Sequence, residues 1–392
     1  MSNEPTVVED YTNFTVQQWR DYFRDRFNIT ELLYTADDLA VPVTEQIFLM
    51  VVFVISMTLA VVGNVLVICV LTFGTRGWTE LNIFLINLSL ADLTMAIFCM
   101  PFTFPTIMKG HWIFGDVMCP VVLSLQQVSI CVSIYTLTAM SVDRYYAVLY
   151  PFKLRVTKNR AKYVVCLVWL VSISLSLIPL ITARSRSYDL NDFVDAPGDI
   201  VYFCSERIEH TAATAYELVI LIITYVIPLS IISYTYYRIG RRLWGRSLPG
   251  VADRKRDLSQ MRSKKKTIKM LVVIVVMFAI CWFPLHVFNI VNDIVPDLYD
   301  EVATQDIMRI TQMCCLLLAT ANSFMNPFIY GFLNETFRKD LKHFVMCRLR
   351  QNRRQSIVSL ATKTTRKSSN SSGKLPLGVT NAPIEVVAVD RI

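Results

Sequence analysis

The sequence predicts an all-α integral membrane protein in which seven helices cross the bilayer as one bundle and a short amphipathic eighth helix follows them. Of its 392 residues, 54% are apolar and only 18% are charged, and the mean hydropathy is positive. A chain of this length and composition is too apolar for an ordinary soluble protein. Apolar runs of about 20 residues, the length that crosses a bilayer as a helix, recur with polar breaks between them.

Seven apolar runs reach this length. They are Ile47–Phe73, Asn82–Thr106, Asp116–Leu149, Tyr163–Thr182, Ala212–Ile239, Thr267–Asn292 and Asp306–Phe332. We therefore expect the bundle at residues 46–333, between an N-terminal tail at 1–45 and a membrane-surface helix at 334–347. Residues 348–392 are rich in Ser, Thr, Lys and Asn, which predicts a disordered tail.

The distribution of positive charge predicts the orientation. Lys and Arg gather after the third and fifth runs, at Lys153, Arg155, Lys158, Arg160, Lys162, Arg238, Arg241, Arg242, Arg246, Arg262, Lys264, Lys265 and Lys266. Cytoplasmic flanks retain such residues during insertion, so the N-terminus is expected to be extracellular. The outward segments are acidic, which favours a basic ligand. The net charge of +8 reflects the basic cytoplasmic side, and no nucleic-acid partner is expected.

The outward segments carry the expected modifications. Asn13 and Asn28 begin glycosylation sequons in the N-terminal tail. Cys119 and Cys204 are the only cysteines expected on the outer side, so they are predicted to form a disulfide. Cys347 follows the amphipathic eighth helix and is a candidate for palmitoylation.

A short amphipathic helix is predicted in the N-terminal tail. Trp19, Phe23 and Phe27 recur at four-residue spacing, which places their rings on one helical face. Two readings remain open: this helix caps the ligand site, or it lies on the membrane surface.

Asp92 is the clearest ionisable residue inside an apolar run, where a charge is costly and marks a candidate functional site. Polar residues at comparable depth are Asn64, Ser133, Asn322, Ser323 and Asn326. Their hydroxyl and amide oxygens around one carboxylate suit a hydrated monovalent cation, so an allosteric sodium ion is expected and no other cofactor. The alternative is a protonated Asp92 in a purely structural hydrogen-bond network.

One face of the third run carries polar residues at three depths. At 100° per residue, Gln126, Ser133 and Arg144 fall within about 20° of one direction. They span about 27 Å at 1.5 Å per residue, close to the hydrocarbon thickness. The third helix is therefore expected to carry a polar stripe across the membrane.

The sixth run carries a second such face. At 100° per residue, one side of this helix carries Trp282, Asn289 and Asp293. Pro284 removes a backbone donor just beyond Trp282 and predicts a kink, which is a candidate hinge.

Together these features resemble the rhodopsin-like, or class A, G-protein-coupled receptors. The residues that carry the resemblance are Gly63-Asn64, Leu90-Ala91-Asp92, Cys119, Asp143-Arg144-Tyr145, Trp169, Pro228, Tyr236, Cys281-Trp282-Phe283-Pro284 and Asn326-Pro327-Phe328-Ile329-Tyr330. The match covers all seven helices. It implies a plasma-membrane receptor that activates a heterotrimeric G protein and whose Ser/Thr-rich tail engages a receptor kinase and arrestin.

The resemblance also assigns roles. It implies G-protein coupling and activation for Asp143, Arg144, Tyr145, Tyr236, Asn326, Pro327 and Tyr330. Asp143 is expected to restrain Arg144 at rest, and the sixth helix is expected to swing outward when ligand reaches Trp282. Many members hold the arginine with an acidic residue at the cytoplasmic end of the sixth helix. This chain has Ser263-Lys264-Lys265-Lys266 there, so that interhelical latch is expected to be absent.

The resemblance narrows the ligand to a neuropeptide. Gln126 replaces the aspartate of amine receptors, and the seventh helix lacks the lysine of opsins. Gln126, Asn289 and Asp293 resemble the set in neuropeptide Y and RFamide receptors, which read an amidated Arg-aromatic C-terminus. The threonine at position 103 resembles the corresponding residue of orexin and pyroglutamylated RFamide receptors. The expected ligand contacts are Thr103, Gln126, Trp282, His286, Asn289 and Asp293. A tachykinin-like or orexin-like peptide is the alternative, because residues 280–286 resemble tachykinin receptors.

Two other classes of membrane protein are less consistent with the sequence. An enzyme needs a nucleophile with a base, or a metal cluster, within the bundle, whereas the four histidines are scattered and form no such motif. A transporter tends to show internal repeats or broken helices in corresponding halves, and no such symmetry is visible.

Overall fold

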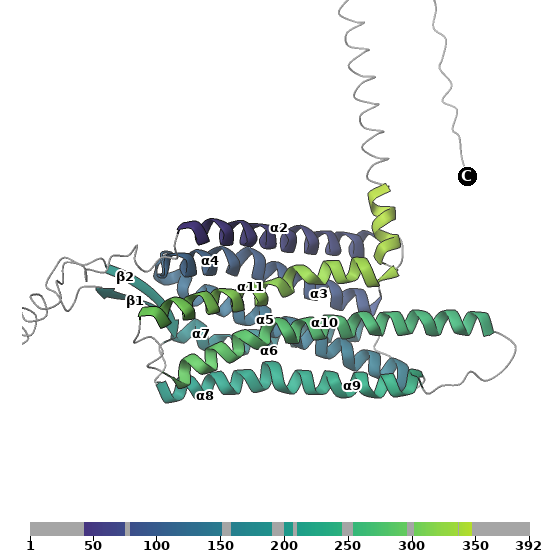
Figure 1. The fold of residues 1–392 in the computed structure, drawn as a ribbon. Helices are drawn as coiled ribbons and strands as arrows, with labels where there is room; N and C mark the ends of the chain where they lie inside the picture. The colour runs from purple at the N-terminus through teal and green to yellow at the C-terminus, as the bar shows by residue number, and fades with distance from the viewer. Residues whose placement is uncertain are drawn as a thin grey trace, which may run out of the picture. The chain divides into compact units, whose positions relative to one another are not determined.

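The computed structural model describes residues 43–74, 79–150, 158–189, 200–206, 210–244, 254–295, 302–335 and 337–346. Within these residues, 7 helices are long and apolar enough to cross a membrane, and they lie alongside one another as a bundle (Figure 1). The spans are Ile47–Phe73, Glu80–Lys109, Gly115–Leu149, Asn159–Thr182, Thr214–Leu243, Lys264–Asn292 and Ile307–Leu333. The predicted seven-helix membrane fold is thus confirmed.

The helices extend further than the apolar runs that predicted them. The first span has the expected bounds, whereas the fifth continues to Leu243 and the sixth begins at Lys264. An apolar run ends at the first charged residue, but helical hydrogen bonds continue through Arg241 and Lys265 because long cationic side chains reach water at a membrane boundary. Helix α2 (Val43–Phe73) likewise begins inside the expected N-terminal tail.

The second span is interrupted by one π-helical turn. It consists of α3 (Glu80–Thr94), the π-helix η3 (Met95–Cys99) and α4 (Met100–Lys109). Thr79 caps α3, since its hydroxyl accepts a hydrogen bond from the backbone N–H of Asn82 at 3.3 Å. A π-turn contains an additional residue, so side chains beyond Cys99 point in a different direction from those of a continuous α-helix.

Helix α5 (Gly115–Leu149) is the central helix and packs against α3, α6 (Lys158–Leu175) and α9 (Ile227–Trp244). A hydrogen-bonded triad joins three of the spans. Asn87 donates to the Thr136 hydroxyl at 2.7 Å and accepts from the Trp169 indole at 2.8 Å. Buried polar groups need partners of this kind, so the triad fixes α3 and α6 against α5.

The remaining spans close the bundle. The fifth joins α8 (His210–Leu221), the π-helix η4 (Ile222–Val226) and α9. The sixth and seventh are α10 (Arg254–Ile294) and α11 (Val302–Leu333), which pack along each other, and α11 also packs on α2 (Figure 1). Helix α10 continues through Pro284, the predicted hinge residue.

A β-hairpin follows the fourth span, which ends in α7 (Leu177–Thr182). Strand β1 (Ala183–Asp189) pairs antiparallel with β2 (Ile200–Glu206), and Ser185 lies opposite Cys204. This hairpin was not predicted from the sequence. Cys119 in the first turns of α5 forms a disulfide with Cys204, with Cα atoms 5.5 Å apart. The predicted disulfide is confirmed, and it ties the hairpin to one end of the bundle.

By the density of contacts within the chain, it divides into two compact units, Met1–Asp340 and Leu341–Ile392. Residues 337–346 are helical where the eighth helix was expected, whereas its membrane-surface position remains a prediction. Several predicted features lie outside the described residues: the glycosylation sites Asn13 and Asn28, the helix of the N-terminal tail, Cys347, residues 348–392 and the side chain of Asp293.

Candidate functional site

A cavity lies within the bundle toward the end that carries the disulfide. Its lining comes from α2, the second span, α5, α10 and α11, and consists of Phe53, Met95, Cys99, Met100, Thr103, Gln126, Trp282, Leu316, Ala319 and Thr320. Three predicted ligand contacts, Thr103, Gln126 and Trp282, therefore share one cavity although they come from different helices.

The polar groups of this cavity are uncharged. The Thr103 hydroxyl donates to the Cys99 carbonyl at 3.0 Å, so its remaining lone pairs point away to accept. The Trp282 indole N–H is buried and lacks a hydrogen-bond partner among the described residues. The Gln126 amide supplies both a donor and an acceptor. The lining thus offers a full set of neutral hydrogen-bonding groups and no ionised side chain.

Aromatic rings on α10 continue from this cavity toward the fifth span. The ring centroids of Trp282 and His286 lie 6.4 Å apart, and that of His286 lies 5.1 Å from Tyr225. The Tyr225 hydroxyl in turn donates to the Ala279 carbonyl at 2.8 Å. His286 thus lies beside the predicted pocket without lining the cavity, and Asn289, one turn further along α10, is half-buried.

The apolar wall of the cavity was missed by sequence reasoning. Phe53 of α2 stacks on Phe104 with ring centroids 3.9 Å apart, and Met95, Cys99 and Leu316 complete the wall. The Cys99–Thr103 spacing of four residues could have indicated one side of this wall. The π-turn hides the contribution of α4, because it rotates α4 relative to α3.

Three of the predicted sodium-site residues, Asp92, Ser323 and Asn326, come together inside the bundle. Asp92 is buried, and its carboxylate accepts a hydrogen bond from the Asn326 side-chain amide at 2.9 Å and another from Ser323. Ser133 and Asn322 are buried as well. The described residues hold no cluster of three or more His, Cys, Asp or Glu side chains. One carboxylate among hydroxyl and amide oxygens therefore suits a monovalent cation better than a divalent one.

A close approach of two helices supports this network. A Cβ atom added to Gly63 of α2 would lie 2.9 Å from Cγ of Pro327 in α11, so a larger residue at 63 would push the helices apart. The next residue, Asn64, donates to the Ser323 carbonyl at 2.8 Å. The motifs that contain Gly63 and Pro327 thus hold the seventh span against the first, next to Asp92.

Asp92→Asn is expected to remove the effect of sodium on agonist binding. The substitution keeps the size of the side chain and the hydrogen bonds with Asn326, but it eliminates the charge that a cation needs. Agonist affinity is measured in sodium and in an organic-cation buffer of equal ionic strength. A sodium response equal to that of the original chain would reject the ion site in favour of a structural network.

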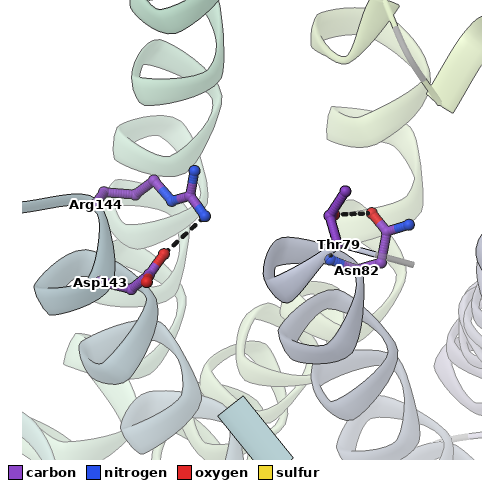
Figure 2. Close-up of polar contacts among 4 residues, drawn as sticks. All are labelled: Thr79, Asn82, Asp143 and Arg144. Carbon is purple, nitrogen blue, oxygen red and sulfur yellow. Dashed lines mark hydrogen bonds and ion pairs between the residues drawn. The ribbon is translucent and has the colours of Figure 1, made fainter. Parts of the chain in front are cut away.

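The opposite end of α5 carries the predicted activation residues. Nη2 of Arg144 lies 2.7 Å from Oδ2 of Asp143, the preceding residue, as Figure 2 shows. The Asp143 side chain is 7% exposed and that of Arg144 is 23% exposed. Nε of Arg144 is buried without a hydrogen-bond partner among the described residues. The Arg144 guanidinium thus pairs with a carboxylate of its own helix, and its Nε–H group is available to donate a further hydrogen bond.

Aromatic residues also pack at the ends of α5, α9 and α11. Tyr145 and Tyr236 pack on a cluster of Ile239, Leu243 and Ile268, which joins α5, α9 and α10. Tyr330 near the end of α11 is fully buried, and its hydroxyl lacks a hydrogen-bond partner within the described part of the chain. Unpaired buried polar groups are costly, so this end of the bundle is suited to a second arrangement in which they find partners.

Comparisons with known proteins agree with this arrangement. The family described as 7 transmembrane receptor (rhodopsin family) matches residues 63–330. A QRFP-like peptide receptor of Branchiostoma floridae is 32% identical over 368 residues, covering 93% of this chain and 94% of that protein. The RYamide receptor of Tribolium castaneum is 30% identical over 75% of this chain and 79% of its own length. Neuropeptide Y receptor type 2 of Homo sapiens is 34% identical over 81% of each chain.

Proposed function

We propose that the ligand of this chain is a peptide that ends in an amidated Arg-Phe or Arg-Tyr. The chain belongs to the rhodopsin family of seven-transmembrane receptors. It is a multi-pass plasma-membrane receptor for a neuropeptide. One observation carries the proposal: Thr103, Gln126 and Trp282 line one cavity whose polar groups are all neutral. The names of two relatives, a QRFP-like peptide receptor and an RYamide receptor, agree with it.

A terminal carboxamide complements this cavity. Its NH₂ group donates two hydrogen bonds, which the Thr103 hydroxyl and the Gln126 carbonyl oxygen accept. Its carbonyl oxygen accepts from the Gln126 amide or from the unpaired Trp282 indole. The terminal aromatic ring then rests against Trp282 and His286, since aromatic rings favour offset or edge-on contacts at such sites.

The penultimate arginine is assigned to Asp293. This residue lies in the last turn of α10, four positions beyond Asn289 and on the face that carries Trp282. A guanidinium meets a carboxylate through two parallel hydrogen bonds, which a lysine ammonium cannot do. The alternative is that Asp293 only begins the acidic segment at 293–301 and attracts any basic ligand.

Asp293→Ala distinguishes a specific ion pair with the ligand arginine from general attraction of basic ligands. Loss of one partner from a desolvated ion pair costs roughly 2 to 5 kcal/mol, so agonist potency is expected to fall at least about 30-fold. Asp297→Ala, the matched control in the same acidic segment, is expected to change potency only slightly. Potency is measured as calcium and cyclic AMP responses to an amidated Arg-Phe peptide. Equal, small losses in both variants would leave general attraction of basic ligands as the explanation.

Signal transfer runs along α5 and α10. The N-terminus is extracellular, so the disulfide end of the bundle faces outward and the Arg144 end faces the cytoplasm, as the Lys and Arg distribution predicts. Ligand contact with Trp282 favours a state in which α10 moves outward, and Arg144, Tyr236 and Tyr330 then line a site for the heterotrimeric G protein. Arrestin and a receptor kinase act on the C-terminal tail.

A further inference from the structure

The sixth span, Lys264–Asn292 of α10, contains no carboxylate that could hold Arg144. Between Asp257 and Asp293 the sequence has no Asp or Glu, and Arg144 forms its ion pair with Asp143 of its own helix. The resting position of α10 therefore depends on other contacts at this end of the bundle.

An ion pair joins α10 to the segment that follows α11. The Lys266 ammonium, near the start of the sixth span, contacts Oε1 of Glu335, two residues beyond the last residue of α11. This hydrogen bond and the positive charge of Lys266 lower the pKa of Glu335 below its ordinary value, which favours the charged form of its carboxyl group. The contact joins residues 69 positions apart in the sequence.

The segment that carries Glu335 is fixed to the bundle. The Asn334 side chain accepts a hydrogen bond from the backbone N–H of Phe337 at 3.0 Å and so caps the helix that follows. The Phe337 ring packs 6.2 Å from that of Tyr330. A Cβ atom added to Gly74 would lie 3.5 Å from the Asp340 side chain. The segment that carries Glu335 thus contacts the ends of α2 and α11.

We propose that the Lys266–Glu335 ion pair is a resting-state tether, which holds α10 against the end of α11 where the usual acidic partner of Arg144 is missing. The proposal rests on the proposed activation of a G protein by outward movement of α10. This movement separates Lys266, which lies on α10, from Glu335, whose segment contacts α2 and α11. The two side chains are 59% and 50% exposed, and exposed pairs are weak. The tether is therefore one that ligand binding can break.

Charge reversal tests the tether. Lys266→Glu and Glu335→Lys are each expected to raise ligand-free nucleotide exchange about two- to fivefold. The double variant, which restores an opposite-charge pair, is expected to return exchange to the original rate. Lys269→Glu, an exposed lysine on the same helix, is the matched control and is expected to change little. Exchange is measured with purified receptor in lipid nanodiscs and a purified heterotrimeric G protein.

Agonist binding provides a second readout. A shift toward the active state raises agonist affinity, so both single reversals are expected to bind agonist more tightly than the double variant. If a reversal does not reach the membrane, Lys266→Met and Glu335→Gln remove the pair more mildly. Unchanged ligand-free exchange in both single variants would overturn the tether, as would failure of the double variant to restore it. Absence of exchange in every receptor, including with agonist, would instead reject the proposed G-protein function.

Discussion

Arg144→Ala is expected to bind agonist with nearly unchanged affinity and to lose agonist-stimulated nucleotide exchange completely. Gln126 and Arg144 lie 18 residues apart on α5, or about 27 Å along the helix, so the substitution leaves the ligand cavity untouched. At the other end it removes the guanidinium that Asp143 holds. A planar cation with several donors is suited to the carbonyl oxygens of an incoming helix end, and alanine offers none of these contacts.

Radioligand binding and nucleotide exchange on the same membranes check this separation. Arg160→Ala removes an exposed arginine from α6 and is the control, expected to retain exchange. Normal exchange by Arg144→Ala would contradict the role assigned to Arg144, and loss of both binding and exchange would indicate a defect in folding.

A peptide with a free C-terminal carboxylate is expected to be on the order of 1,000-fold less potent than its amide, a difference of about 4 kcal/mol. A carboxylate accepts hydrogen bonds but donates none, so it would place a charge against the oxygens of Thr103 and Gln126. Among the described residues, none that lines the cavity has an ionised side chain to compensate that charge. An uncompensated charge in a site closed to water costs several kcal/mol.

Substitutions of two neighbouring glutamines, one that lines the cavity and one that does not, test the predicted preference for the amide. Gln126→Leu removes a cavity donor and acceptor, so the amide is expected to lose potency and the difference between amide and acid to narrow. Gln127→Leu is the control, because the Gln127 amide donates to the Cys131 thiol at 3.5 Å and does not line the cavity. Amide and acid of equal potency on the original chain would contradict the neutral cavity as the site of the C-terminus.

Features that depend on the properties of single residues were predictable from the sequence. Apolar runs predicted the seven spans because a helix that crosses the hydrocarbon layer needs about 20 predominantly apolar residues. Cys119 and Cys204 were predicted as partners because the remaining cysteines lay elsewhere, and they form the disulfide. The grouping of Asp92 with Ser323 and Asn326 was also predictable, since buried polar groups seek one another.

Features that depend on local backbone geometry were not predictable. The π-turn at Met95–Cys99 has no strong sequence signal, yet it decides which side of the second span faces the cavity. The β1–β2 hairpin pairs a mainly polar strand with one that begins with five apolar residues. Neither strand alternates clearly between polar and apolar residues, so the pattern did not indicate strands. The Lys266–Glu335 pair joins two exposed residues far apart in the sequence, and neither residue differs from many other surface charges.

Nucleotide exchange on a purified heterotrimeric G protein tests the central claim most directly. The purified chain in lipid nanodiscs is exposed to a panel of amidated peptides ending in Arg-Phe or Arg-Tyr, to their free acids, and to tachykinin-like and orexin-like peptides. We predict that at least one amidated Arg-aromatic peptide accelerates exchange at concentrations at which its free acid and the other peptides do not. Acceleration only by the tachykinin-like or orexin-like peptides, or by none of the panel, would contradict the proposed ligand.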